Sequence, residues 1–213
     1  MARSARSGSR GSAGEAGLSF SPATAGRWRD LETLFGPERG ANGGCWCQWW
    51  RIGRPEWNEL GRDGRKARFE AEVGSGPAPG ILAYRGEVAV GWCAVAPRSS
   101  TPRMQSSRIA RPAAPGDDGV AAIDHDDVWA ITCFFIAPAE RKGGMMRALI
   151  KAAVAQARAG GARAVEAIPI DPRRELVWGE GFVGIASVFA IEGFVEIARR
   201  SPTRPLMRLT LRP

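Results

Sequence analysis

The apolar and polar positions of the first half of the chain change from a helical period to a strand period. Apolar residues from Ala25 to Phe35 fall on one helical face, and a second helical stretch is expected within Pro55–Val73. Two apolar runs, Ile81–Tyr84 and Val88–Val95, are separated by three turn residues and predict an antiparallel hairpin. The first half therefore contains two helices followed by paired strands.

The second half predicts a strand, a helix and another strand. The nearly continuous apolar run Val128–Ile136 is typical of a central strand that is covered on both faces. A helix is expected after Gly144, ending at Gly160–Gly161, and a strand at Ala164–Ile170. Such a unit pairs its two strands in parallel. A shorter helix and two strands are expected at Val183–Glu192, Val195–Ala198 and Leu206–Leu211.

Two segments lack such periodicity. Residues 1–17 consist mainly of Gly, Ser, Ala and Arg, which predicts a disordered head before one folded domain at 18–213. Residues 96–127 are rich in Pro, Arg, Ser and Asp, and this segment is longer than a simple connecting loop. This connection is expected to be either functional or partly disordered.

The composition narrows the class of protein. Thirty basic and twenty-two acidic residues give a net charge of +8, which suits polyanionic partners such as nucleic acid or a phosphorylated cofactor. No nucleic-acid-binding motif accompanies this charge, so nucleic acid is not favoured. The longest apolar stretch has twelve residues, too short to cross a bilayer. Without a secretory signal in the first nineteen residues, the protein is expected in the cytoplasm.

The four cysteines do not predict a metal site. Cys93 and Cys133 lie within apolar strands, as expected for reduced, buried thiols. Cys45 and Cys47 are separated by one residue, whereas structural zinc sites space their cysteines by two to four. The only histidine, His125, lies among aspartates and is interpreted as an exposed loop residue. No metal is expected.

The junction after Ile136 combines features of an anion site. The chain turns there through Arg141, Lys142, Gly143 and Gly144 into the helix, so free backbone N–H groups and two cations converge. A phosphate fits this arrangement. A glycine-assisted turn with solvated charges explains the same residues equally well.

The surrounding residues resemble a known family. Segment Phe134–Leu149 resembles the acetyl-coenzyme A motif of the GNAT superfamily of N-acetyltransferases, an apolar strand followed by Arg/Gln-x-x-Gly-x-Gly/Ala at a helix start. Arg141 and Gly144 match, whereas Met146 stands where the family has Gly or Ala. Segment Ser187–Phe194 is similar to the family's short helix ending in Gly-Phe. The resemblance implies a mixed α/β fold, with a mostly antiparallel sheet, a parallel pair splayed at its centre and helices on both faces.

The resemblance also implies a reaction and a cofactor. It implies acetyl transfer from acetyl-CoA (coenzyme A) to a primary amine by direct attack, with the backbone of Phe135 and Ile136 binding the pantetheine. Phe189 stands at the position where the family often has a catalytic tyrosine, and is counted with the cofactor-binding residues. The pyrophosphate is assigned to the turn and helix start, namely Arg141, Lys142, Gly143, Gly144, Met145, Met146 and Arg147.

The catalytic groups are less defined. The only tyrosine is Tyr84, so Ser187 or water would protonate the departing thiolate. Glu166, a lone carboxylate within an apolar strand, is the first candidate for the base, and an outward-facing charge is the alternative. Asp171, at the end of that strand, is the second candidate.

The acceptor is expected near a tryptophan-rich segment. Trp49, Trp50 and Arg51 would suit a flat or anionic acceptor, although at least two of the three tryptophans Trp46, Trp49 and Trp50 are expected in the core. The acceptor is a small-molecule or peptide amine, no membrane partner is expected, and a homodimer is compatible with the sequence.

Two alternative functions remain for the whole protein, and one further glycine motif has to be considered. A coenzyme A binding module with a regulatory role and weak or no turnover is the main alternative, and a basic nucleic-acid-binding protein is a third. Residues 179–184 match the dinucleotide pattern Gly-x-Gly-x-x-Gly. They lack the preceding strand that this fingerprint needs, so a nicotinamide enzyme is not favoured.

Overall fold

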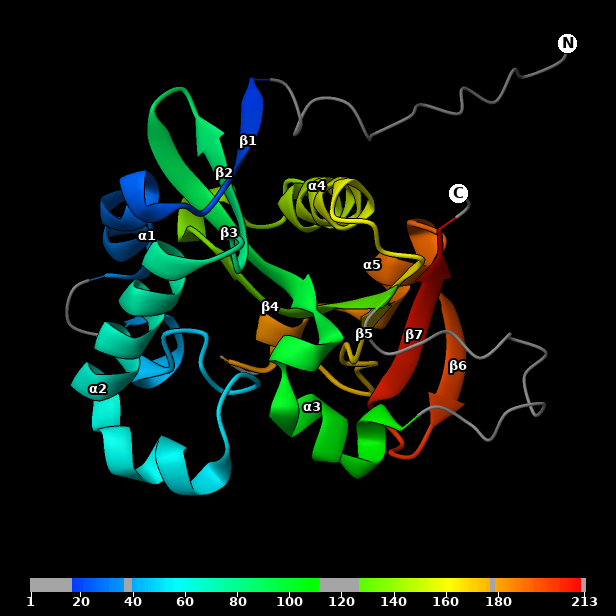
Figure 1. Ribbon diagram of the computed structural model, residues 1–213. Coiled ribbons are helices and arrows are strands. Elements are labelled where there is room, and N and C mark those ends of the chain that lie inside the picture. The colour runs from blue at the N-terminus through cyan, green and yellow to red at the C-terminus, as the bar shows by residue number, and fades with distance from the viewer. Residues whose placement is uncertain (1–16, 37–39, 112–126, 177–178, 212–213) are drawn as a thin grey trace, which may run out of the picture.

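The computed structural model describes residues 17–36, 40–111, 127–176 and 179–211 (Figure 1). In these ranges seven strands form one sheet in the order β1-β2-β3-β4-β5-β7-β6. Only β4 and β5 pair in parallel, and the other neighbours are antiparallel. This confirms the predicted mixed α/β fold. The strands are β1 (Leu18–Pro22), β2 (Gly80–Arg85), β3 (Val88–Pro97), β4 (Val128–Ile136), β5 (Ala164–Ala167), β6 (Val195–Arg199) and β7 (Pro205–Thr210).

Helices cover both faces of the sheet (Figure 1). Helices α1 (Trp28–Phe35) and α2 (Arg54–Ser75) lie on one face, where Leu31 and Phe69 pack with Trp92 in one core. On the opposite face α4 (Met145–Ala159) packs Leu149 against Cys93, beside the short α5 (Ala186–Ile191). The apolar side of each helix therefore faces the sheet, as the periodicity predicted.

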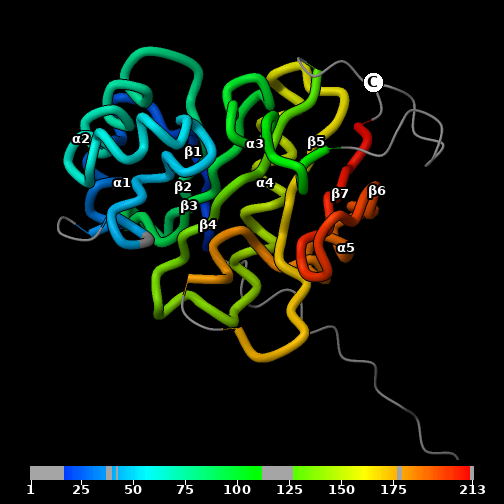
Figure 2. The backbone as a smooth tube through the Cα atoms, turned by 90° about the horizontal axis from the view of Figure 1, so that it is seen from below, coloured from blue at the N-terminus to red at the C-terminus, as the bar shows by residue number. Residues whose placement is uncertain are grey.

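A third core forms around helix α3. Helix α3 (Pro102–Ser106) contributes Met104, which packs with Trp50, Ala130 and Ile168. Seen from below, α3 lies between α2 on one side and β6 and β7 on the other (Figure 2). Segment 96–127, which lacks periodicity, thus holds ordered turns from Arg98 to Ala110. Its part 112–126, with His125, lies outside the described residues, as do residues 1–16 of the head.

The parallel pair separates at the centre of the sheet. Pairing between β4 and β5 runs from Val128 with Ala164 to Ile131 with Ala167, and β4 then continues alone to Ile136 on that side. At the same point β4 carries a bulge. Cys133 pairs with Ala94 and Ile131 with Val95, so Thr132 of β4 has no partner residue in β3. The chain after β5 joins a different partner, by an isolated parallel bridge between Ile170 and Ile185. The splay is thus present.

The largest difference from the sequence prediction lies before α5. The helix predicted at Val183–Glu192 is the shorter α5, and a 3-10 turn, η7 (Glu180–Val183), precedes it. Gly184 separates them with a φ of 81°, and a Cβ there would lie 2.9 Å from the Phe134 ring and 2.6 Å from the Phe189 ring. Only glycine fits this position.

Other differences are smaller. The edge strand β1 was missed, and the strand predicted at Ala164–Ile170 ends at Ala167. Helix α2 is longer than predicted and kinks at Gly61, where φ is 58°. In the described part of the chain, no helix combines the length and apolar character that crossing a membrane would need.

Candidate functional site

The start of α4 forms an exposed cradle of backbone N–H groups. After β4 and the turn η6 (Pro138–Glu140), residues 141–144 are exposed and lead into the helix. Gly144 caps the helix with a φ of 88°, and a Cβ there would meet no atom within 4 Å. Arg147 makes the first helical bond, donating its N–H to the Gly144 carbonyl at 2.9 Å. The N–H groups of Met145 and Met146 precede that bond and point out of the helix end.

Positive charge surrounds this cradle. Arg141 and Lys142 are exposed, and within the described residues no salt bridge joins either of them to an acidic side chain. The adjacent Glu140 is held by Arg85 through two hydrogen bonds of 2.8 Å, which lower the pKa of Glu140. Its charge is thus matched elsewhere. The cradle has the composition of an anion site.

The next three residues divide between core and surface. Met145 is buried under α4, and Met146 is half-buried against the same core, so it packs on the protein there. Arg147 pairs with Glu192 at the end of α5, with 2.6 Å between Nε and Oε1. This pair joins the two helices and occupies part of the guanidinium that was expected to bind pyrophosphate.

The end of β4 is covered by a segment that the sequence reasoning did not assign. Phe135 and Ile136 are half-buried, and the Phe135 ring stacks on Phe182 of η7 with 6.1 Å between centroids. Gly179 and Gly184 flank η7 with φ values of 93° and 81°. The glycine pattern of residues 179–184 was the available signal, and its glycines permit these turns.

A small cavity lies at the splay. It is too narrow to hold a water molecule and is lined by Trp50, Met104, Ile131, Thr132 and Ile168. Ile131 belongs to the core under α4, whereas Trp50, Met104 and Ile168 belong to the core on the opposite face. The cavity therefore lies between the strands where the two faces of the sheet meet.

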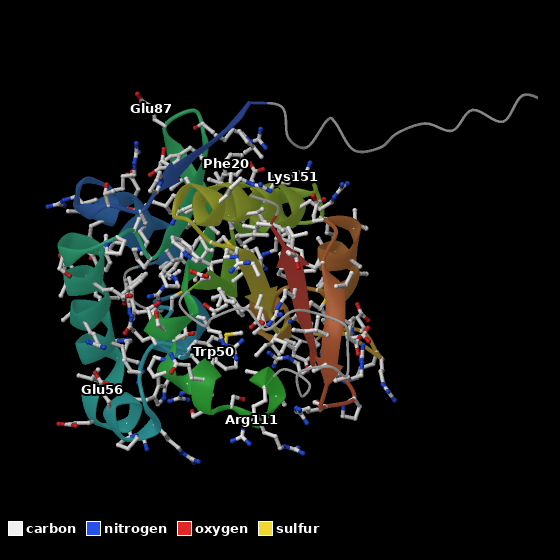
Figure 3. All side chains as sticks on the ribbon, turned by 45° about the vertical axis from the view of Figure 1, so that its right-hand side comes forward. Phe20, Trp50, Glu56, Glu87, Arg111 and Lys151 are labelled. Carbon is white, nitrogen blue, oxygen red and sulfur yellow. The ribbon has the colours of Figure 1, made fainter. Side chains whose placement is uncertain are left out.

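The tryptophan-rich segment has both buried and exposed side chains. Trp46 and Trp50 are buried, as expected for at least two of its tryptophans, and Figure 3 places Trp50 next to α3. Trp49 is 44% exposed and contacts Trp57 edge-on, with the Arg103 guanidinium 3.9 Å from the centre of its ring. Of the residues expected to bind acceptor, Trp49 lies at the surface and Trp50 at the splay.

Arg51 has a different setting. It is buried, pairs with Glu72 through Nη1 and donates from Nη2 to the Pro79 carbonyl at 2.8 Å. It lines a groove of about 780 Å³ along α2, whose other walls include Ala67, Ala71, Ser75 and Ser100. Its guanidinium is thus engaged mainly with the protein itself.

Glu166 does not have the setting of a general base. Its side chain is 1% exposed, and Arg208 donates to Oε1 from Nε and Nη2 at 3.0 and 2.6 Å. Arg98 pairs with the other oxygen, and burial beside Arg208 lowers the pKa of Arg98 to about 10. A carboxylate enclosed by two guanidinium groups is not open to an amine or water. The expected role is corrected to a structural one.

The other catalytic candidates are separated. Asp171 accepts a hydrogen bond of 2.8 Å from Arg199 at the surface, and Ser187 is exposed in the first turn of α5. Phe189 is fully buried between Phe134 and Phe194, with centroid distances of 5.9 and 5.0 Å. Phe189 was expected to bind the cofactor, but it lies in the core and not at a solvent-open site.

Tyr84, Cys47 and Cys93 are buried, whereas Cys45 and Cys133 are half-buried. Tyr84 is in β2, two strands from β4, and donates to Asp30 at 2.7 Å. Burial raises the pKa of the Cys93 thiol well above its ordinary value and that of Cys45 to about 12. Such thiols stay protonated at neutral pH. Among the described residues no group of His, Cys, Asp and Glu side chains is arranged to hold a metal.

Comparisons with known proteins agree with this geometry. Residues 46–175 match the family described as Acetyltransferase (GNAT) family, whereas no curated protein matches the chain. Among solved structures, yncA from Salmonella typhimurium with its cofactor acetyl-CoA is similar at 13% identity and a TM-score of 0.50, covering 92% of this chain and 95% of that one.

Two further structures are similar. A GNAT-family structure from Desulfovibrio desulfuricans has 14% identity and a TM-score of 0.51, over 91% of this chain and 98% of that one. PaiA N-acetyltransferase from Thermoplasma acidophilum, in complex with coenzyme A, has 9% identity and a TM-score of 0.50, over 91% and 99%. At these identities the likeness concerns the fold.

Proposed function

The chain belongs to the GNAT acetyltransferase family, and we propose that it transfers an acetyl group from acetyl-CoA to a primary amine. The observation that carries this proposal is the exposed, cationic, glycine-containing start of α4, which follows directly after β4 has parted from β5. A candidate anion site and an opening between parallel strands thus lie together on one strand–turn–helix unit.

The residues at this unit fit the acyl donor. Arg141, Lys142 and the N–H groups of Gly143 to Met146 would bind the pyrophosphate, since they offer charge and donors at an open helix end. The backbone of Phe135 and Ile136, beyond the bulge, would bind the pantetheine. Structures of similar fold from Salmonella typhimurium and Thermoplasma acidophilum contain acetyl-CoA or coenzyme A, which supports this assignment.

The opening where β4 parts from β5, beyond Ile131 and Ala167, is the proposed place of transfer. When bound, acetyl-CoA supplies an activated thioester, which the acceptor nitrogen attacks from the side of α3. The C–N bond forms as the C–S bond breaks. Glu166 is enclosed by Arg98 and Arg208, so the amine would give its proton to water from the solvent side of the opening. Ser187 or water returns a proton to the thiolate.

This mechanism predicts a pH dependence. An alkylamine has a pKa of about 10, and only its neutral form is nucleophilic. Because the described residues at the opening include no positioned base, the rate is expected to rise about tenfold per pH unit up to that pKa. A rate that instead levels off near pH 7 would contradict the mechanism and indicate a protein base.

A thiol-release assay with acetyl-CoA and a panel of small and peptide amines tests the proposed activity. Release that depends on both the protein and the amine is expected, with the acetylated amine as product. A protein that binds coenzyme A in calorimetry but acetylates no amine would instead be a coenzyme A binding module. Binding of oligonucleotides that weakens with salt, without coenzyme A binding, would contradict both.

A further inference from the structure

We propose that Arg103 and Arg54 bind a carboxylate of the acceptor, so that the protein acetylates amines that also carry this anionic group. This inference rests on the proposed function and names the class of its acceptor. It assigns a role to a cation–aromatic cluster formed by Trp49, Arg54, Trp57, Arg65 and Arg103.

The cluster stacks two guanidinium groups on two indole rings. Arg103 lies 3.9 Å from the centre of the Trp49 ring and 5.7 Å from that of Trp57, and Arg65 lies 4.1 Å from the centre of the Trp57 ring. Stacking fixes the guanidinium plane and leaves its edge for hydrogen bonds. Because Trp49 is 44% exposed, the cluster lies at the protein surface.

The positive charge of the cluster has no counter-charge. Within the described parts of the chain, no salt bridge joins Arg54, Arg65 or Arg103 to a carboxylate. Glu56, in the first turn of α2, pairs instead with Arg68 at 3.1 Å. Burial lowers the pKa of Arg103, and the neighbouring positive charge of Arg54 lowers it further. A ligand that brings a negative charge would relieve this repulsion.

The cluster also offers hydrogen-bond donors without acceptors. Arg103 is half-buried and donates from Nε to the Ile52 carbonyl at 3.2 Å, its one side-chain hydrogen bond among the described residues, while its Nη2 is buried without a partner. Ile52 lies directly before the start of α2, where Trp57 makes the first helical bond, to the Gly53 carbonyl. The N–H groups that precede that bond are not used within the helix. Both kinds of donor suit a carboxylate.

The cluster lies beside the proposed place of transfer. Trp50 and Met104 line the narrow gap at the splay, and Trp49 and Arg103 are their immediate neighbours in the sequence. Trp49 and Arg103 are thus on the outer side of the same wall, on the side of α3 from which the acceptor approaches. Arg51, the cation that the sequence suggested for this role, is engaged by the protein instead.

Matched pairs of acceptors test this inference. In the thiol-release assay, ω-amino acids of increasing chain length are compared with their carboxamides, which keep the amine and remove the charge. Rates are compared at equal concentrations of neutral amine. At the best length the carboxylate is expected to be preferred at least about tenfold in kcat/KM, because charge-assisted hydrogen bonds are the stronger ones. The difference should lie mainly in KM, since the group is bound equally before and during transfer.

Three variants identify the residue responsible. Arg103→Gln removes the charge and is expected to lower kcat/KM for the carboxylate about tenfold to hundredfold, while the carboxamide changes by less than about threefold. Arg103→Lys keeps the charge without the planar group and should fall between. The control Arg62→Gln removes an exposed cation from the same helix, paired with Asp63 at 3.1 Å, and should leave both acceptors unaffected.

The outcomes separate this inference from the proposed function. If carboxylates and carboxamides are acetylated equally at every length, or if Arg103→Gln lowers both alike, the inference is overturned while acetyl transfer stands. A loss as large in Arg62→Gln would overturn it too. If the unaltered protein acetylates no amine, both fail together. Should Arg103→Gln not fold, Arg54→Gln, exposed at the start of α2, is expected to reduce the preference about threefold.

Discussion

The two ends of the proposed site differ in how they are built. The start of α4 is exposed and polar, with cations and backbone donors contributed by consecutive residues, 141–147. The splay is closed and apolar, and Trp50, Met104, Thr132 and Ile168 reach it from four separate segments. A charged donor can thus be bound by one continuous loop, whereas the close packing at the splay is assembled from the whole fold.

Removal of the buried Glu166 carboxylate near the splay is expected to have the largest effect, and that effect is on stability. Glu166→Gln leaves two buried guanidinium groups without a counter-charge, and is expected to lower the free energy of unfolding by about 3–5 kcal/mol. Denaturant unfolding measures this loss. Any activity that remains should keep the pH profile of the unaltered protein.

An exposed ion pair provides the control for that loss. Glu196→Gln removes a carboxylate that pairs with Arg199 at the surface, and is expected to change stability by less than about 1 kcal/mol. A stable Glu166→Gln variant that has lost its activity only at neutral pH would restore the general-base role and contradict the structural one.

The exposed end should respond in binding and not in stability. Arg141→Ala removes one charge-assisted contact, and coenzyme A affinity is expected to fall about tenfold to hundredfold, or about 1.5–3 kcal/mol. Arg163→Ala removes an exposed cation between α4 and β5, away from the start of α4, and should leave the affinity unchanged. Equal losses in both variants would mean that net charge, not the cradle, attracts the ligand.

A substitution of Phe189 tests whether this side chain belongs to the core or borders the proposed site. Phe189→Tyr places a hydroxyl among Phe134, Phe194 and Gly184, and is expected to destabilise the protein by about 1–3 kcal/mol. Turnover per folded molecule should not increase. A tenfold gain in kcat would show that the hydroxyl reaches the leaving sulfur and that this side chain borders the site.

The sequence predicted those parts whose causes are local. The bounds of β4, Val128–Ile136, follow from one nearly continuous apolar run, and the start of α4 follows from two adjacent glycines. Met104 was missed because its burial depends on Trp50 and Ile168, which are distant in the chain. The environment of Glu166 was missed for the same reason, since its partners come from other strands and from the turn after β3.

The measurement closest to the central claim places a negative charge at the cradle. At Gly144 any side chain is strained by the φ of 88°, whereas Gly143 has no left-handed φ and a Cβ there would meet its nearest atom at 3.7 Å. Gly143→Asp and its control Gly143→Ala should therefore both fold.

Calorimetric titration with coenzyme A then decides whether the phosphates bind at the start of α4. Gly143→Ala is expected to bind within about threefold of the unaltered protein, and Gly143→Asp to lose affinity by more than about hundredfold through like-charge repulsion. If the aspartate variant binds as tightly as the alanine variant, the phosphates are bound elsewhere and the account of this site is wrong.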